Sequence, residues 1–329
     1  MNIAVEAPRH RSPGCRLHVK ILCGSLCAAS AACAIEMEWV KVGDPGNSPD
    51  RTGYGSVAYE FEIGKFEVTV AQYLEFLNTI DADGPHGVGK QSAVRSMRSA
   101  EPGKPIYAIP DADSQKPIRG MRFADAMRFA NWMHHGCGRC DTETGAYNIS
   151  KHGPFAPREP GARFALTSED EWYKAAYYHP ESKGGPSGSY WLYPTRSNQM
   201  PGFDAAGSTQ ANHANYFPLE LTKWDGTIPR KAQDVLPVGS YTQSHSYYGT
   251  YDQGGNVWEW NEAIVFGSQR GLRGGCVLNT YEKMRSWVRS HVPPDGPDFR
   301  FTSDATGFRL VRLMPASDKT ENQNGDTLR

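Results

Sequence analysis

The sequence lacks the motifs by which many common enzymes are recognised. Its 329 residues contain no Walker loop, no Gly-x-Gly-x-x-Gly string after a strand, no Gly-x-Ser-x-Gly elbow and no His-Glu-x-x-His zinc motif. It also lacks a charge excess, since 35 basic residues face 36 acidic ones and the formal net charge is −1. A general nucleic-acid binder or a polybasic membrane-surface protein is therefore excluded, because both require a strong positive field.

No hydrophobic run is long enough for a permanent membrane anchor. Residues 1–34 instead combine a basic start, a short apolar run and the sequence Ala32-Cys33-Ala34, which together are typical of a secretory signal peptide. Cleavage before Cys33 as a lipoprotein and a disordered N-terminus are the alternatives. We expect one domain over residues 35–314, a disordered polar tail over residues 315–329, and a periplasmic or secreted protein.

Cysteine is scarce beyond the leader, where only Cys137, Cys140 and Cys276 remain. The Cys-Gly-Arg-Cys spacing of the first two suits a tight disulfide, a redox pair or half of a zinc site. No second Cys-x-x-Cys or His pair at metal spacing accompanies it, so zinc is poorly supported. We expect a structural disulfide between Cys137 and Cys140, which leaves Cys276 unpaired.

Glycine and proline are abundant, with 34 and 23 residues, and favour a loop-rich α+β domain. Apolar alternation predicts strands over residues 59–63, 66–68 and 307–313, with a bulge at Gly64 between the first two. Helical spacing predicts helices over residues 70–77 and 122–134, and a capping box at Ser168 opens a third. Residues 181–238 show little periodicity and are expected to form loops.

Six sequence blocks occur in a definite order: Ile63–Thr69, Leu166–Trp172, Val238–Tyr241, Tyr248–Trp260, Leu272–Gly275 and Gly307–Arg309. Together they resemble the formylglycine-generating enzyme, or sulfatase-modifying factor, family over nearly all of residues 37–313. The resemblance implies a single domain with the C-type-lectin-like fold, a mixed sheet, few helices and many loops. It also implies the family activity, the oxidation by O2 of a cysteine in a sulfatase polypeptide to Cα-formylglycine.

A structural calcium ion is implied by the same resemblance. The Gly255–Trp260 turn exposes backbone carbonyls beside a carboxylate, which are oxygen ligands that calcium accepts. The candidate ligands are Gly255, Val257 and Glu259, with a second family site at Asn215, Tyr216 and Asp225. The alternative is that the turn only bonds internally and its tryptophans are core residues.

Copper is where the sequence departs from the family pattern. Family enzymes bind Cu(I) between two thiolates that lie four and nine residues after the last glycine of Arg-Gly-Gly. Counted from Gly275, those positions hold Asn279 and Met284. Cys276, which follows the motif directly, could form a shifted site with Met284, or both could be inert core residues. The candidate catalytic residues are therefore Cys276, Met284 and Asn279, and the copper chemistry is in doubt.

A non-catalytic role on the same scaffold is the alternative to an oxidase. We expect Arg273, Arg285 and Trp287 to line a substrate cleft, with Tyr247, Tyr248 and His291 as further loop candidates. The partner would be a sulfatase-type polypeptide or an extracytoplasmic ligand, bound by a calcium-stabilised binding or accessory module. Fold alone does not choose between enzyme and binder.

Overall fold

The computed structural model describes residues 35–80, 106–204, 206–219, 234–294 and 305–314. The expected signal peptide, residues 1–34, and the expected polar tail, residues 315–329, lie outside the described residues. Among the described helices, none has both the length and the apolar character needed to cross a membrane.

The first sheet is antiparallel and has the strand order β1-β2-β8-β3. Its strands are β1 (Trp39–Val42), β2 (Phe61–Gly64), β8 (Leu310–Leu313) and β3 (Phe164–Leu166). The alternation that predicted the strand over residues 59–63 is seen in β2, where Phe61 and Ile63 are fully buried. This sheet therefore joins both ends of the described chain.

The second sheet is mixed and has the order β6-β5-β4-β7. It consists of β4 (Trp258–Val265), β5 (Gln269–Arg273), β6 (Ser290–Val292) and β7 (Thr306–Gly307), and only the pair β4–β7 is parallel. The Arg-Gly-Gly block thus ends β5, and the Gly-Asn-Val-Trp-Glu-Trp block runs into β4. Both blocks lie side by side because β4 and β5 are antiparallel neighbours.

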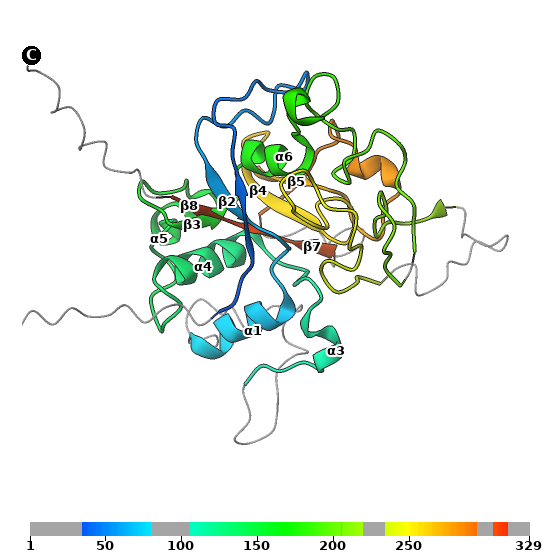
Figure 1. Cartoon of the computed structure of the whole chain (residues 1–329). Helices are drawn as coiled ribbons and strands as arrows, with labels where there is room; N and C mark the ends of the chain where they lie inside the picture. Colours follow the sequence, from blue (N-terminus) through cyan, green and yellow to red (C-terminus); the bar gives the residue numbers. More distant parts are fainter. Residues whose placement is uncertain (1–34, 81–105, 205, 220–233, 295–304, 315–329) are drawn as a thin grey trace, which may run out of the picture. The chain divides into compact units, whose positions relative to one another are not determined.

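Helices form where the sequence predicted them. They are α1 (Val70–Thr79), α4 (Phe123–His134) and α6 (Glu169–Tyr177), joined by short turns α3 (Asp111–Ser114), α5 (Ile149–His152), η2 (Gly153–Phe155), η3 (Glu181–Lys183) and η6 (Tyr281–Met284). Thr69 and Ser168 both make reciprocal capping boxes, with Gln72 and Glu171. In Figure 1, α4 lies beside β3 and β8, and α6 lies over β4 and β5.

Two strand predictions differ from the structure. Residues 66–68 form no strand, since the Val68 amide donates to the Phe308 carbonyl and the Val68 carbonyl accepts from Ile118 instead of continuing a ladder. The run 307–313 is split into β7 and β8, which belong to different sheets. Phe308 and Arg309 form the corner between the sheets, and both are fully buried.

The main core lies between α1, α4 and this corner. Aromatic rings from all three meet at centroid distances of 5.3–6.5 Å, namely Tyr73, Phe76, Phe129, Trp132 and Phe308. Each of these side chains is fully buried, and aromatic side chains contribute large buried areas to a core. A single hydrophobic cluster therefore anchors both sheets.

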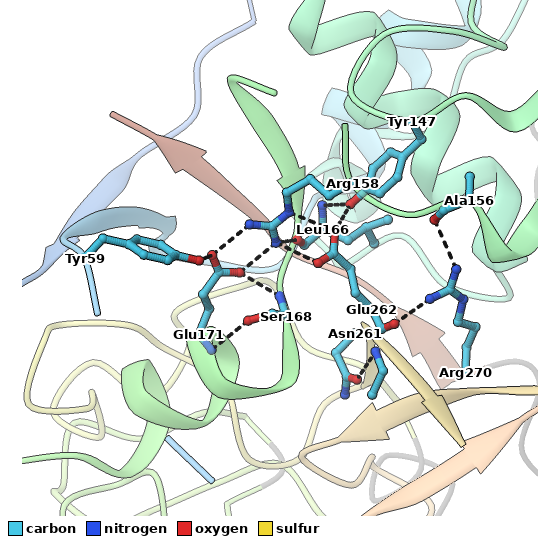
Figure 2. A network of polar contacts seen from close by, with 11 residues as sticks. Tyr59, Tyr147, Ala156, Arg158, Leu166, Ser168, Glu171, Asn261, Glu262 and Arg270 are labelled. Atoms are coloured by element: carbon cyan, nitrogen blue, oxygen red, sulfur yellow. Dashed lines mark hydrogen bonds and ion pairs between the residues drawn. The ribbon is translucent and has the colours of Figure 1, made fainter. Parts of the chain in front are cut away.

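A polar network links α6 to β4 (Figure 2). Arg158 binds Glu171 in α6 through two bonds of 2.8 and 2.9 Å, and its Nη2 atom lies 2.9 Å from Glu262 in β4. Tyr59 donates to Glu171 at 2.7 Å, and Tyr147 donates to Glu262. Burial raises the pKa of Glu262, against the lowering effect of Arg158. The network is a structural joint, because one arginine bridges carboxylates from two different elements.

Candidate functional site

The turn that follows the Arg-Gly-Gly block buries Cys276. Gly274 and Gly275 adopt φ of +97° and +74°, conformations that favour glycine. The next residue, Cys276, is only 1% exposed. Its amide donates to the Asn279 side-chain oxygen at 3.1 Å, and its sulphur lies 3.2 Å from the same oxygen. Burial raises the pKa of the Cys276 thiol to about 11, so the group is a protonated thiol at neutral pH.

Met284 lies elsewhere in the interior. It packs with Tyr193, Ala214 and Tyr216, whereas Cys276 belongs to the main core cluster. Cys276 and Met284 therefore belong to different clusters of buried side chains, and no bond between their sulphur atoms is found among the described residues. Asn279, at the other predicted position, is held by Cys276 through its side chain and by Phe217 through its carbonyl. With one buried, protonated thiol and no second thiolate beside it in the part of the chain that the structure describes, these residues do not fit a Cu(I) site.

The structure brings the two predicted calcium segments together. Asn215 and Gly255 form a parallel bridge, and the Asn256 amide donates to the Asn215 carbonyl at 2.7 Å. Gly255 has φ +86°, and a Cβ there would lie 2.2 Å from the Asn215 oxygen, so only glycine fits. Tyr216 points into the apolar cluster, where its hydroxyl donates to the Pro201 carbonyl. Asp225 lies outside the described residues.

Glu259 is already engaged by protein donors. Both of its carboxylate oxygens accept from Arg309, at 2.6 and 2.7 Å, and one also accepts from the Trp172 indole at 2.8 Å. Glu259 and Arg309 are fully buried. The carboxylate predicted as a calcium ligand therefore forms a buried ion pair that ties β4 to the corner between the sheets.

Two carboxylates that the sequence analysis missed lie beside this pair. Glu67 is 1% exposed, and its Oε1 atom has no hydrogen-bond partner, while Oε2 accepts from Asn256 at 3.1 Å. Burial raises the pKa of Asp252 to about 6, and burial with repulsion from Asp252 raises the pKa of Glu67. Arg309 pairs with Glu259 alone, and the raised pKa values show that the surroundings favour a proton on Glu67 and Asp252. Both acids lie within the sequence blocks that resemble the family, and their place in those blocks could have identified them as candidates.

The carboxylate of Asp252 could attract a cation, but few other side-chain ligands lie around it. Its Oδ2 atom accepts from the Gly239 amide at 2.6 Å. Within the described ranges, no three His, Cys, Asp or Glu side chains are grouped as metal ligands. A calcium ion here would accordingly need backbone carbonyls of the Gly255–Val257 turn as its other oxygen ligands. The described residues supply only part of a calcium donor set, because Glu259 is held by Arg309 and the Asn256 carbonyl accepts from the Val277 amide.

Arg273 does not line a cleft, contrary to the sequence prediction. It is fully buried, binds Glu169 at 2.7 and 2.9 Å, and donates to the carbonyls of Ser286 and Val288 at 2.7 and 2.9 Å. Arg273 ends strand β5, and its long side chain reaches past the strand to the loop that carries Ser286 and Val288. Arg273 therefore holds the segment around Trp287 from behind and acts as a positioning residue.

Trp287 borders an open cleft of about 540 Å³. The wall residues come from three loops: Pro49, Asp50, Arg51, Ser187, Gly188, Tyr190, Trp191, Leu192, Asn198, Ser286 and Trp287. Trp287 is 47% exposed, and the guanidinium carbons of Arg51 and Arg285 each lie 5.7 Å from its ring centroid. The predicted cleft residue Trp287 thus lies at the cleft, and Arg285 supports it.

Arg51 and Trp191 were not predicted, because they belong to loops without periodicity. Arg51 is exposed and makes no ion pair within the part of the chain that the structure describes. None of the remaining loop candidates lines this wall, but Tyr247 adjoins it through His179, whose ring accepts from the Trp191 indole at 3.2 Å. Tyr247 stacks on His179 with a centroid distance of 4.0 Å, Tyr248 donates to the Gly43 carbonyl, and His291 contacts Phe266.

The predicted disulfide between Cys137 and Cys140 is wrong. Cys140 has a free thiol, whereas Cys137 is disulfide-bonded. Cys137 follows the end of α4 with φ +64°, and its sulphur lies 3.5 Å from the Met133 sulphur, back along the helix. The left-handed backbone at Cys137 points its side chain toward the helix. The Cys-x-x-Cys spacing does not predict in which direction either side chain points.

Comparison with known proteins places the whole domain in one family. The profile of the sulfatase-modifying factor enzyme 1-like domain matches residues 41–314, and the chain belongs to this family. The family resemblance and the loop-rich α+β architecture predicted from the sequence are both confirmed.

Solved structures that this chain resembles include CarF, at 19% identity and a TM-score of 0.49, covering 85% of this chain and 99% of that one. The Treponema denticola variable protein 1 is also 19% identical, with a TM-score of 0.47, covering 84% of this chain and 95% of that one. PvdO from Pseudomonas aeruginosa is 19% identical, with a TM-score of 0.43, covering 84% of this chain and 92% of that one.

Proposed function

We propose that this chain is an extracytoplasmic, non-catalytic member of the sulfatase-modifying factor family that binds a ligand in the cleft beside Trp287. One observation carries the proposal. The thiol nearest to the family's copper position, Cys276, is buried, protonated and held by Asn279. An oxidase of this family needs accessible thiolates, so the family's oxidation of a sulfatase cysteine is not the activity that these residues support.

The cleft supports a binding role in its place. A half-exposed tryptophan beside two guanidinium groups is a feature that a folded chain seldom presents without a use, since aromatic and arginine side chains dominate recognition surfaces. Arg273 fixes the loop that carries Trp287 through two backbone carbonyls. Binding is favoured when such anchors are held in place before the ligand arrives.

Calcium and export form part of the same proposal. A calcium ion near Asp252 and the Gly255–Val257 carbonyls would favour the charged carboxylate of Asp252, whose pKa burial raises to about 6. The basic and apolar pattern of residues 1–34 supports export. After expression in a secreting host, N-terminal sequencing is expected to find a chain that begins at Ile35, and an uncleaved chain would contradict export.

The decisive experiment is an anaerobic Cu(I) titration against a chromogenic chelator. We expect the chelator to retain all the copper, and a cysteine-containing sulfatase peptide incubated with the protein, Cu(I) and O2 to remain unoxidised. A second titration uses the double variant Asn279→Cys, Met284→Cys, which restores thiolates at the two family positions. Copper uptake by this variant alone would show that only the ligands are missing.

Tight copper binding by the unmodified chain would overturn the proposal. If that binding were lost in Cys276→Ser or Met284→Leu, it would identify the shifted site that the structure argues against. The matched control is Cys140→Ser, which removes the other free thiol and is expected to leave every titration unchanged.

A further inference from the structure

We infer that the cleft beside Trp287 binds an anionic saccharide, a short chain of pyranose rings that carry carboxylate or sulfate groups. This inference rests on the proposed binding function and specifies its ligand. It starts from the shape of the cleft, whose volume of about 540 Å³ lies within the range of roughly 300–1,000 Å³ that is usual for small-molecule sites. Short oligomers therefore match it in size.

The aromatic wall is the first reason for a saccharide. Two indoles, Trp191 and Trp287, and the phenol ring of Tyr190 line the cleft. The face of an aromatic ring carries partial negative charge, and the C–H bonds on one face of a pyranose carry partial positive charge. Sugar rings can therefore stack on these indoles while their hydroxyl groups remain at the edge.

The polar residues of the same wall suit hydroxyl groups. Ser187 provides a hydroxyl that can donate and accept, and Asn198 provides amide N–H donors, since its side-chain oxygen already accepts from the Leu192 amide at 2.9 Å. Asp50 is held internally, because its carboxylate accepts from the Arg51 amide and from the Thr52 and Tyr173 hydroxyls. Its carboxylate is thus stabilised by neutral donors of the protein.

The anionic character follows from the two arginines. Arg51 has no acidic partner among the described residues, and the Arg285 guanidinium hydrogen-bonds the Tyr193 hydroxyl at 3.2 Å and interacts with the nearby Glu282 carboxylate. Guanidinium groups bind carboxylates and sulfates through planar, paired hydrogen bonds. Because both guanidinium groups lie against the Trp287 ring, a sugar stacked beside that ring would have its anionic group within reach of a cation.

A peptide is the less favourable occupant. Extended peptides commonly bind by adding a strand to an exposed sheet edge. No lining residue of this cleft belongs to any of the eight described strands, so the cleft offers side chains and not a strand edge. The aromatic and cationic side chains of the described wall therefore suit a ligand with rings and negative charges better than an extended peptide.

The test is isothermal titration of the full chain with trigalacturonic acid, with its methyl ester, and with a sulfated galactose trimer. The ester keeps the rings and removes the charge. We expect the acid and the sulfated trimer to bind and the ester to bind more weakly, and the stronger of the two anions identifies the natural group. Trp287→Ala is expected to weaken binding of the acid by about 30-fold, and Arg51→Gln by up to about fivefold.

Arg119→Gln is the matched control, since Arg119 is exposed and does not line the cleft. Equal binding of acid and ester, unchanged in Arg51→Gln, would overturn the anionic inference and leave the cleft as a neutral-sugar site. If no trimer binds but a random peptide pool quenches Trp287 fluorescence, relative to Trp287→Phe, the saccharide inference fails and the binding function stands. If neither ligand affects Trp287, both proposals fail.

Discussion

The segment that follows Arg273 has two sides of opposite character. Toward the interior, Cys276 is 1% exposed and Met284 is packed among aromatic rings. Toward the cleft, Trp287 is 47% exposed and contacts two guanidinium groups. Chemistry at sulphur requires an accessible thiolate, whereas recognition requires accessible shape and charge. The interior side of the segment thus has no accessible thiolate, and the cleft side presents an exposed aromatic ring and cations that suit binding.

The arginines of the molecule divide in the same way. Arg273 and Arg309 are fully buried, and each binds a buried glutamate together with backbone carbonyls. Arg51 is exposed and has no acidic partner among the described residues. The buried pairs hold the scaffold, and the exposed arginine is available to a ligand. The difference teaches that residue type did not decide the role of these arginines and that burial did.

The largest effect is expected from Arg309→Met. The substitution leaves Glu259 buried without a cation, which costs about 3–5 kcal/mol of unfolding free energy, measured by urea denaturation. Arg312→Met is the control three residues further on, because its pair with Glu62 is half-exposed and worth less than about 1 kcal/mol. A similar small loss in both variants would erase the distinction between buried and exposed arginines.

The second effect concerns Asp252 and pH. Its pKa is raised from 3.8 to about 6, so the folded state binds the proton more tightly than the unfolded state. Without calcium, stability is therefore expected to fall as pH rises from about 4 to 6, by up to about 3 kcal/mol. Urea titrations in EDTA across this range measure the loss.

Calcium is expected to reverse most of that loss, because the ion favours the charged carboxylate. Asp252→Asn should remove both the pH dependence and the calcium response, whereas the exposed Asp111→Asn should leave both unchanged. A calcium response that survives in Asp252→Asn would place the ion elsewhere in the molecule.

The third effect tests the interior side directly. At pH 8 iodoacetamide is expected to alkylate Cys140, which is partly exposed, more than about 100-fold faster than Cys276, whose thiol is buried with a pKa of about 11. Peptide mass spectrometry distinguishes the two positions. In urea the two rates should converge, and fast native labelling of Cys276 would mean that the thiol is accessible after all.

The smallest effect is expected on the cleft side. Arg51→Gln is predicted to change the thermal stability by less than about 0.5 kcal/mol, since the side chain is exposed and unpaired. Differential scanning calorimetry of the two proteins measures it. A loss above 1 kcal/mol would mean that Arg51 is part of the scaffold, and the contrast between the two sides would be lost.

Local features of the fold were predictable from the sequence. Thr69 and Ser168 mark the beginnings of α1 and α6, because a capping box depends only on residues three apart. The run 307–313 was predicted as one strand and forms two, since the change of sheet at Phe308 depends on partners far away in the chain. Periodicity does not record which sheet a strand joins.

The candidate site was predictable in part. Trp287, which the sequence analysis expected in a substrate cleft, lines a cleft of the structure, and the replacement of the two copper ligands by Asn279 and Met284 was visible in the sequence. Arg51 and Trp191 were missed because they reach the cleft from loops about 240 and 100 residues away from Trp287. Arg273 was misplaced because its burial depends on Glu169, on another element.

The sequence by itself determined the family, the capped helices and the loss of thiolates at the copper positions, because each is written in residues close together or in ordered blocks. Only the tertiary structure decided which arginines are buried, that Cys276 is sealed by Asn279, and that Arg51 lies against Trp287. The physical reason is that burial and pairing arise from contacts between distant segments, and such contacts set the charge and reactivity of a side chain.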